Sequence, residues 1–148
     1  MPSTYLSLHD HLVFSTKNRM PFIKDQWMAD LHNYLGGAVK GLGGFPQGVG
    51  GVADHVHLLV GLKATHCLAD FLRELKKASS VWIHENCGLG DFSWQEGYSA
   101  FTVSPTAREG VQRYIANQAE HHRAKPYRQE LIDMLRSAGV DFDEKYLD

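Results

Sequence analysis

Two histidines inside an apolar segment constrain the fold of this chain more than any other feature. His55 and His57 lie in residues 51–60, where Val and Leu dominate as they do in a strand of a sheet core. Side chains alternate faces along a strand, so both imidazoles point to one face, roughly 6–7 Å apart along it. Both can therefore bind one metal ion. The alternative interpretation is one core histidine and one exposed histidine.

Periodicity places strands and helices around this segment. The expected elements, in chain order, are a strand over 5–16, a helix over 25–42, strands over 45–52 and 51–60, a helix opened by Thr65, a strand over 98–103, and helices over 104–122 and 129–137. The glycine-rich residues 45–52 are predicted to form an edge strand or a bulge, in a hairpin with the His55–His57 strand. A phosphate-binding loop is the alternative, but no Gly-Lys-Ser/Thr follows the glycines.

Composition is that of a globular protein, with 43% hydrophobic and 22% charged residues in 148. We expect a single domain over 1–148 whose acidic C-terminal tail, 127–148, contains no catalytic residue that we can identify. The net charge is −2, but residues 133–148 alone contribute −3, so the rest of the chain is slightly basic. Basic faces that bind nucleic acid are therefore not excluded.

Targeting signals do not appear in the sequence. No apolar run approaches membrane-spanning length, and residues 1–4 lack the features of a signal peptide. We therefore expect a cytoplasmic protein that binds no membrane, with Cys67 and Cys87 as free thiols.

A second motif follows about fifty residues after the histidines. Tyr114 and Gln118 stand four residues apart in a predicted helix, so they share a face that His122 continues. An amide oxygen suits a hard divalent ion such as Mg2+ or Mn2+. A tyrosine beside such an ion can attack phosphorus. The alternative is a partly buried tyrosine with a solvated glutamine.

Four segments in unbroken order resemble one known family. Residues 11–19, 50–60, 94–104 and 114–122 are similar to the opening strand, the histidine strand, a later strand and the catalytic helix of the single-tyrosine HUH transposases of the insertion sequence 200/605 family. The resemblance covers roughly residues 5–123.

This resemblance implies an α/β (α+β) fold, namely a ferredoxin-like sandwich of an antiparallel sheet with helices packed on one face. It also implies cleavage and rejoining of single-stranded DNA with hairpin ends through a 5′-phosphotyrosine intermediate on Tyr114. His55, His57 and Gln118 would hold one divalent metal, Mg2+ or Mn2+. Members of the family are homodimers, so Tyr114 could act in trans on the partner's histidines.

Basic and aromatic side chains are candidates for contact with DNA. The basic candidates are Lys17, Arg19, Arg73, Lys76 and Lys77, of which the last three could instead form an ordinary solvated helix face. The aromatic candidates for base stacking are Phe92, Trp94 and Tyr98. Two other functions fit the same residues: a non-catalytic, domesticated single-stranded DNA/RNA-binding module, and a metal-dependent nuclease that uses water.

Overall fold

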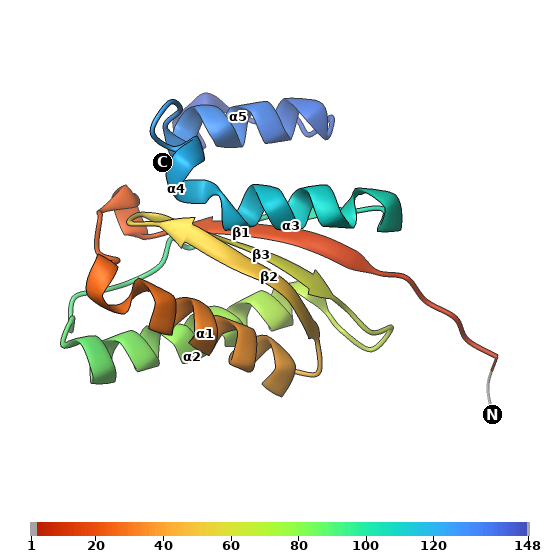
Figure 1. Cartoon of the computed structure of the whole chain (residues 1–148), viewed down its shortest axis with the longest axis horizontal. Coiled ribbons are helices and arrows are strands. Elements are labelled where there is room, and N and C mark those ends of the chain that lie inside the picture. Colours follow the sequence, from red (N-terminus) through yellow and green to blue (C-terminus); the bar gives the residue numbers. More distant parts are fainter. Residues whose placement is uncertain (1–2, 148) are drawn as a thin grey trace.

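A computed structural model describes residues 3–147 of the chain, shown in Figure 1. Its strands are β1 (His9–Ser15), β2 (Phe45–Val52), β3 (His55–Gly61) and β4 (Ser99–Thr102). Its α-helices are α1 (Asp25–Gly41), α2 (Leu68–Cys87), α3 (Arg108–Ala116), α4 (Gln118–His121) and α5 (Tyr127–Ser137). Short 3-10 turns are η1 (Lys17–Arg19), η2 (Pro105–Ala107) and η3 (Glu144–Tyr146).

The four strands form one antiparallel sheet in the order β2-β3-β1-β4. With two helical crossovers, this is the ferredoxin-like arrangement, so the expected fold is confirmed. Residues 45–52 do form a strand, at the edge of the sheet and with a bulge between Pro46 and Gly48. β2 and β3 make the predicted hairpin. The glycines thus belong to a strand and not to a phosphate-binding loop.

α1 and α2 pack together on one face of the sheet (Figure 1). Alternation along β1 and β3 points Phe14, Val56 and Leu58 to this face. There they meet Leu35 of α1 and Leu72 of α2 in the main core, where all five side chains are fully buried. The expected layer of helices on one face is present.

The opposite face of the sheet, which carries the two histidines, is covered as well. Figure 1 shows α3, α4 and α5 across it, with α5 outermost. Ile115 of α3 packs on Leu59, and Leu131 of α5 packs on Val13. The C-terminal segment is therefore packed against the domain and not a loose tail, although Asp148, one of its acids, lies outside the described residues. Its helix also begins at Tyr127, two residues earlier than expected.

The first residues of one strand and two helices differ from the predictions. β1 begins at His9 and not at Tyr5, so the alternating pattern of the first residues does not extend the strand. α2 is preceded by Cys67 at its N-cap position instead of Thr65. Thr106 and Glu109 have the spacing of a capping box, but that box does not form, since Ala107 occupies the N-cap of α3 without a side-chain hydrogen bond.

No helix within residues 3–147 is both long and apolar enough to cross a membrane. Cys67 and Cys87 are free, as expected.

Candidate metal and tyrosine site

His55 and His57 lie side by side on β3 with both imidazoles on the face covered by α3 to α5. Neither side chain is exposed to solvent, while Val56 between them points into the core against α1 and α2. Their ring centroids are 5.1 Å apart. The prediction that both histidines share one face is therefore confirmed, and the alternative of one exposed histidine is wrong.

Gln118 reaches the same place from the helical layer. α3 ends at Ala116, and Asn117 leaves helical geometry (φ −102°, ψ 24°), so the predicted single helix is split in two. Even so, Gln118 Oε1 lies 3.3 Å from His55 Nε2. The Gln118 amide nitrogen donates to the Tyr114 carbonyl oxygen at 3.2 Å, which directs the amide oxygen toward the histidine.

Glu130 of α5 occupies the centre of the cluster. Its Oε1 atom lies 3.0 Å from His57 Nε2 and 3.4 Å from His55 Nε2. Its Oε2 atom accepts a hydrogen bond from the Tyr114 hydroxyl. The sequence motifs did not point to this glutamate, because it lies in the acidic C-terminal segment, outside both motifs. A signal existed: Glu130 shares a helical face with Tyr127 and Leu131, so an acid stood in an apolar stripe.

His122 completes the group. Its Nε2 atom lies 3.0 Å from Gln118 Oε1 and 3.2 Å from Glu130 Oε1. One ligand atom from each of His55, His57, His122 and Glu130 falls within 4.8 Å of all the others. Three imidazoles and two side-chain oxygens therefore converge on one point between the sheet and α5.

Outer hydrogen bonds orient the two strand histidines. Asp54 Oδ1 lies 2.7 Å from His55 Nδ1, and His11 Nε2 of β1 lies 2.8 Å from His57 Nδ1. Each Nδ1 atom is thereby engaged, which leaves each Nε2 atom facing the cluster. A partner on the second ring nitrogen is the usual support of a metal-binding histidine.

Burial and hydrogen bonding set the protonation states. Burial lowers the pKa of His57 to about 4 and that of His11 to about 3, so both are neutral near pH 7. Burial also disfavours charge on His55, but its bonds to Asp54 and Glu130 outweigh this and raise its pKa above the usual value. Burial favours the neutral form of Glu130, yet hydrogen bonds from the imidazoles hold its pKa below the usual range. The acid is therefore a carboxylate.

Tyr114 lies at the rim of this cluster within the same chain. Its ring centroid is 5.7 Å from that of His57. Burial, followed by the neighbouring Glu130 carboxylate, raises the pKa of the Tyr114 hydroxyl above its usual value, so the resting group is a phenol. Tyr114 and Glu130 also line a cavity of about 430 Å3 whose wall includes Phe101 and Met134. The tyrosine can thus be reached from outside.

The donor set fits a divalent metal ion. Ligand atoms about 2.1 Å from an ion lie about 3.0 Å apart at right angles and about 3.4 Å apart in a tetrahedron. The separations from Glu130 Oε1 to His57, His122 and His55 are 3.0, 3.2 and 3.4 Å. Neutral imidazoles, a carboxylate and an amide oxygen are all suitable ligands.

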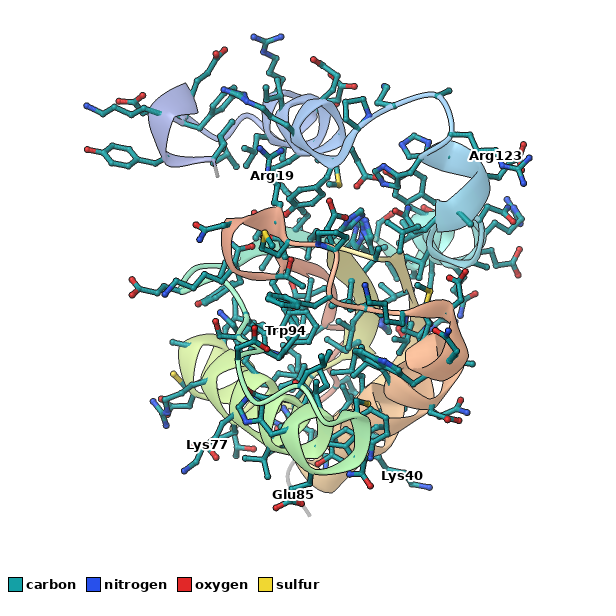
Figure 2. All side chains as sticks on the ribbon, turned by 90° about the vertical axis from the view of Figure 1, so that its left-hand side faces the viewer. Arg19, Lys40, Lys77, Glu85, Trp94 and Arg123 are labelled. Atoms are coloured by element: carbon teal, nitrogen blue, oxygen red, sulfur yellow. The ribbon has the colours of Figure 1, made fainter. Side chains whose placement is uncertain are left out.

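The basic residues of α2 lie away from this site. α2 covers the face of the sheet opposite to the histidines, and Figure 2 shows Lys77 pointing to solvent at that side of the molecule. Arg73 is paired with Asp70 at 2.9 Å. The Lys76 ammonium donates to the backbone carbonyls of Gly97 at 2.9 Å and of the two preceding residues. Lys76 therefore fixes the loop before β4.

The basic residues of η1 lie nearer. Arg19 lines one cavity together with Asp54, His122 and Tyr127, and Figure 2 shows it on the side of the molecule that carries α5. Lys17 is exposed and lines a different cavity from the one that Arg19 lines. The structure thus brings Arg19, alone among the five predicted basic residues, into a cavity shared with residues of the cluster.

Two of the three predicted stacking aromatics are buried, so that prediction is wrong for them. Phe92 and Trp94 are 2% and 7% exposed and pack edge to face with centroids 4.9 Å apart. The Trp94 indole donates to Ser79 Oγ at 3.0 Å, inside the core between the sheet and α2. Trp94 also packs edge to face on Phe14, with centroids 4.8 Å apart, so the aromatic segment before β4 fills the core. Tyr98 is exposed.

Comparisons with known proteins agree on one family. The family model described as "Transposase IS200 like" matches residues 4–118. The ISDra2 transposase TnpA of Deinococcus radiodurans is 33% identical over 72 residues, which are 44% of this chain and 51% of that protein. The chain thus spans about half the length of that relative.

Two solved structures are similar to this one. A crystal structure described as a transposase from Deinococcus radiodurans R1 has a TM-score of 0.64 at 28% identity, over 80% of this chain and 95% of that one. A REP-associated tyrosine transposase bound to a REP hairpin has a TM-score of 0.60 at 15% identity, over 82% of this chain and 73% of that one. The second likeness concerns the fold alone.

Proposed function

Because this chain belongs to the IS200-like transposase family, we propose that it cleaves and rejoins single-stranded DNA with Tyr114 as the nucleophile. One observation carries this proposal: the Tyr114 hydroxyl stands at the rim of a buried cluster of side chains that could hold a metal ion, and it faces a cavity. A nucleophile next to a metal site is what transfer of a phosphoryl group requires.

His55, His57 and Gln118 would hold one divalent ion, Mg2+ or Mn2+. Such an ion, when bound, polarises the phosphate and offsets the charge that develops on its oxygens. The protein's own part is to fix these ligands: Asp54 and His11 orient the two imidazoles, and the Tyr114 carbonyl orients the amide of Gln118.

Tyr114 would attack the scissile phosphorus through its phenolic oxygen. A phosphorus–oxygen bond to the tyrosine forms, and the bond to the 3′ oxygen breaks. The DNA 5′ end is then linked to Tyr114, and the other end is a free 3′-OH that can reverse the step. Two acceptors lie within reach for the phenol proton, namely Glu130 Oε2 and His121 Nε2, the latter 3.4 Å away. Restoring the proton to the leaving 3′ oxygen balances the reaction.

The proposed substrate is single-stranded DNA that carries a hairpin. A structurally similar transposase was solved with a hairpin bound, and Arg19 offers a cation beside the cluster. We also propose that the chain forms a homodimer. Tyr114 already faces the histidines of its own chain, so exchange of the tyrosine helix between subunits is not needed to assemble the site.

The decisive experiment incubates labelled single-stranded hairpin DNA with the protein and Mn2+ or Mg2+. Covalent protein–DNA adducts are then separated under denaturing conditions. We expect an adduct with the wild type and with the control Tyr146→Phe, at a tyrosine that is 77% exposed, but none with Tyr114→Phe. An adduct in Tyr114→Phe would disprove the choice of nucleophile. Cleavage without any trapped adduct would point to a nuclease that uses water, and binding without cleavage would point to a non-catalytic binding module.

A further inference from the structure

We propose that Glu130, supported by His122, is a ligand of the metal site, and that this site takes a first-row transition metal ion in preference to Mg2+. The inference rests on the metal site of the proposed function and extends it. Both residues lie beyond residue 118, where the match to the family model ends. They come from the chain that follows α3.

Geometry supports the ligand role first. Glu130 Oε1 lies 3.0 to 3.4 Å from the Nε2 atoms of His57, His122 and His55. These are the spacings of atoms that share one ion. A carboxylate that only bridged two residues of the fold would need to meet one or two donors. The Oε1 atom of Glu130 alone faces three imidazole nitrogens, all of which also lie close to one another.

Charge points the same way. The three ligands of the proposed function are two imidazoles, which bind a metal in their neutral form, and an amide, so they bring no negative charge to a divalent cation. Glu130 supplies that charge from a side chain that is 1% exposed. A buried carboxylate is strongly destabilising unless its charge is paired. The imidazoles around Glu130 offset part of this cost, and a cation at the centre of the cluster would complete the pairing.

The ligand types determine the class of metal. Three imidazoles and two oxygens form a mixed nitrogen and oxygen set. Mg2+ favours oxygen ligands and retains several of its waters, whereas Mn2+, Co2+ and Zn2+ accept imidazole readily. Glu130 also couples the metal to the nucleophile, because its second oxygen accepts a hydrogen bond from the Tyr114 hydroxyl. One carboxylate would thus position both.

The test measures metal binding and needs no DNA. Wild type, Glu130→Gln, Glu130→Asp, His57→Ala and the control Glu120→Gln are stripped of metal with a chelator. Glu120 is suitable because it is an exposed acid of the neighbouring helix α4, paired with Arg123. Calorimetric titration with Mn2+, Zn2+ and Mg2+ gives the affinity and stoichiometry. Thermal melts with and without metal report on the fold, and Co2+ absorption reports on the ligand set.

We expect one site, with Mn2+ and Zn2+ bound more tightly than Mg2+. Binding should weaken at least about tenfold in Glu130→Gln, with a changed Co2+ spectrum, and should stay unchanged in Glu120→Gln. Glu130→Asp keeps the charge but withdraws it from the cluster, because the side chain is shorter. If Glu130→Gln does not fold, a loss of metal affinity in Glu130→Asp supports the role of Glu130 as a ligand. Wild-type affinity and an unchanged Co2+ spectrum in folded Glu130 variants, with loss in His57→Ala, would overturn this inference and leave the proposed function standing. Failure of the wild type to bind any metal would overturn both, and a preference for Mg2+ would overturn the metal class.

Discussion

Gly50→Ala should disturb the site although Gly50 carries no functional group. Gly50 lies on β2 directly beneath the last turn of α3, and it pairs with His57 in the sheet register. A Cβ atom at this position would stand 2.2 Å from the carbonyl oxygen of Ile115, whereas real Cβ contacts are essentially never below 3.0 Å. Relief therefore requires a displacement of about 1 Å. Either α3 moves and takes Tyr114 with it, or β2 moves and strains its pairing with His57.

Two losses should follow. Overpacking of this kind destabilises by about 1–3 kcal/mol, and each kcal/mol lowers the Tm of a chain of this size by about 2–4 °C. A shift of about 1 Å between a nucleophile and its target can slow a reaction roughly 100-fold. Urea unfolding measures the loss of stability, and the rate of covalent adduct formation measures the loss of activity.

Gly48→Ala is the matched control on the same strand. A Cβ there meets its nearest atoms only at 3.9 Å, which is ordinary contact. It should therefore leave the unfolding midpoint and the adduct rate close to those of the wild type. If Gly50→Ala behaves like Gly48→Ala in both assays, the close approach of β2 and α3 does not constrain the site and the reasoning is refuted.

Other perturbations test separate contacts. Tyr114→Phe should remain folded and bind DNA while adduct formation is lost, which gel separation and a binding titration check together. His57→Ala should abolish metal binding measured by calorimetry, and unchanged affinity would exclude it as a ligand. Lys76→Gln should lower the free energy of unfolding by about 1 kcal/mol, because one part-buried and two exposed hydrogen bonds to backbone carbonyls are lost, but should weaken DNA binding no more than Lys77→Gln does. The metal-free protein should lose stability as the pH falls from about 6.5 to about 4, because the unfolded chain binds protons at His11 and His57 while the folded chain, with pKa values of about 3 and about 4, does not. Urea midpoints across this range check the sign, and a midpoint that rises on acidification contradicts it.

The parts of the fold that were predictable are those in which local pattern and packing agree. Alternation over residues 51–60 requires a strand with both histidines on one face, and the structure has it. The helical period from Asp25 to Gly41 and the hairpin of β2 and β3 were found for the same reason. Helix starts were less predictable because Thr65 and Thr106 carry the right side chains for caps, yet Cys67 and Ala107 occupy the N-cap positions.

The site was predictable only where its members lie on recognisable motifs. His55, Gln118 and Tyr114 are brought together as the two motifs suggested, although the helix that bears them is broken at Asn117. Glu130 could not be placed from spacing, since only the return of α5 across the sheet carries it to the histidines. The acidic composition of the segment concealed one acid that stands on the buried face of its helix.

The return of α5 has a consequence for any attempt to shorten or fuse this chain. A cut after residue 118, where the family similarity ends, would keep Tyr114 and the strand histidines but would uncover Val13. It would also remove Glu130, which together with Asp54 supplies the carboxylates that contact the strand histidines within residues 3–147. Solubility and metal affinity would then be lost in one step, and no truncation series could tell them apart. Single substitutions on α5 separate the two: Leu131→Ala reduces the apolar contact and keeps the carboxylate, and Glu130→Gln removes the charge and keeps the apolar contact.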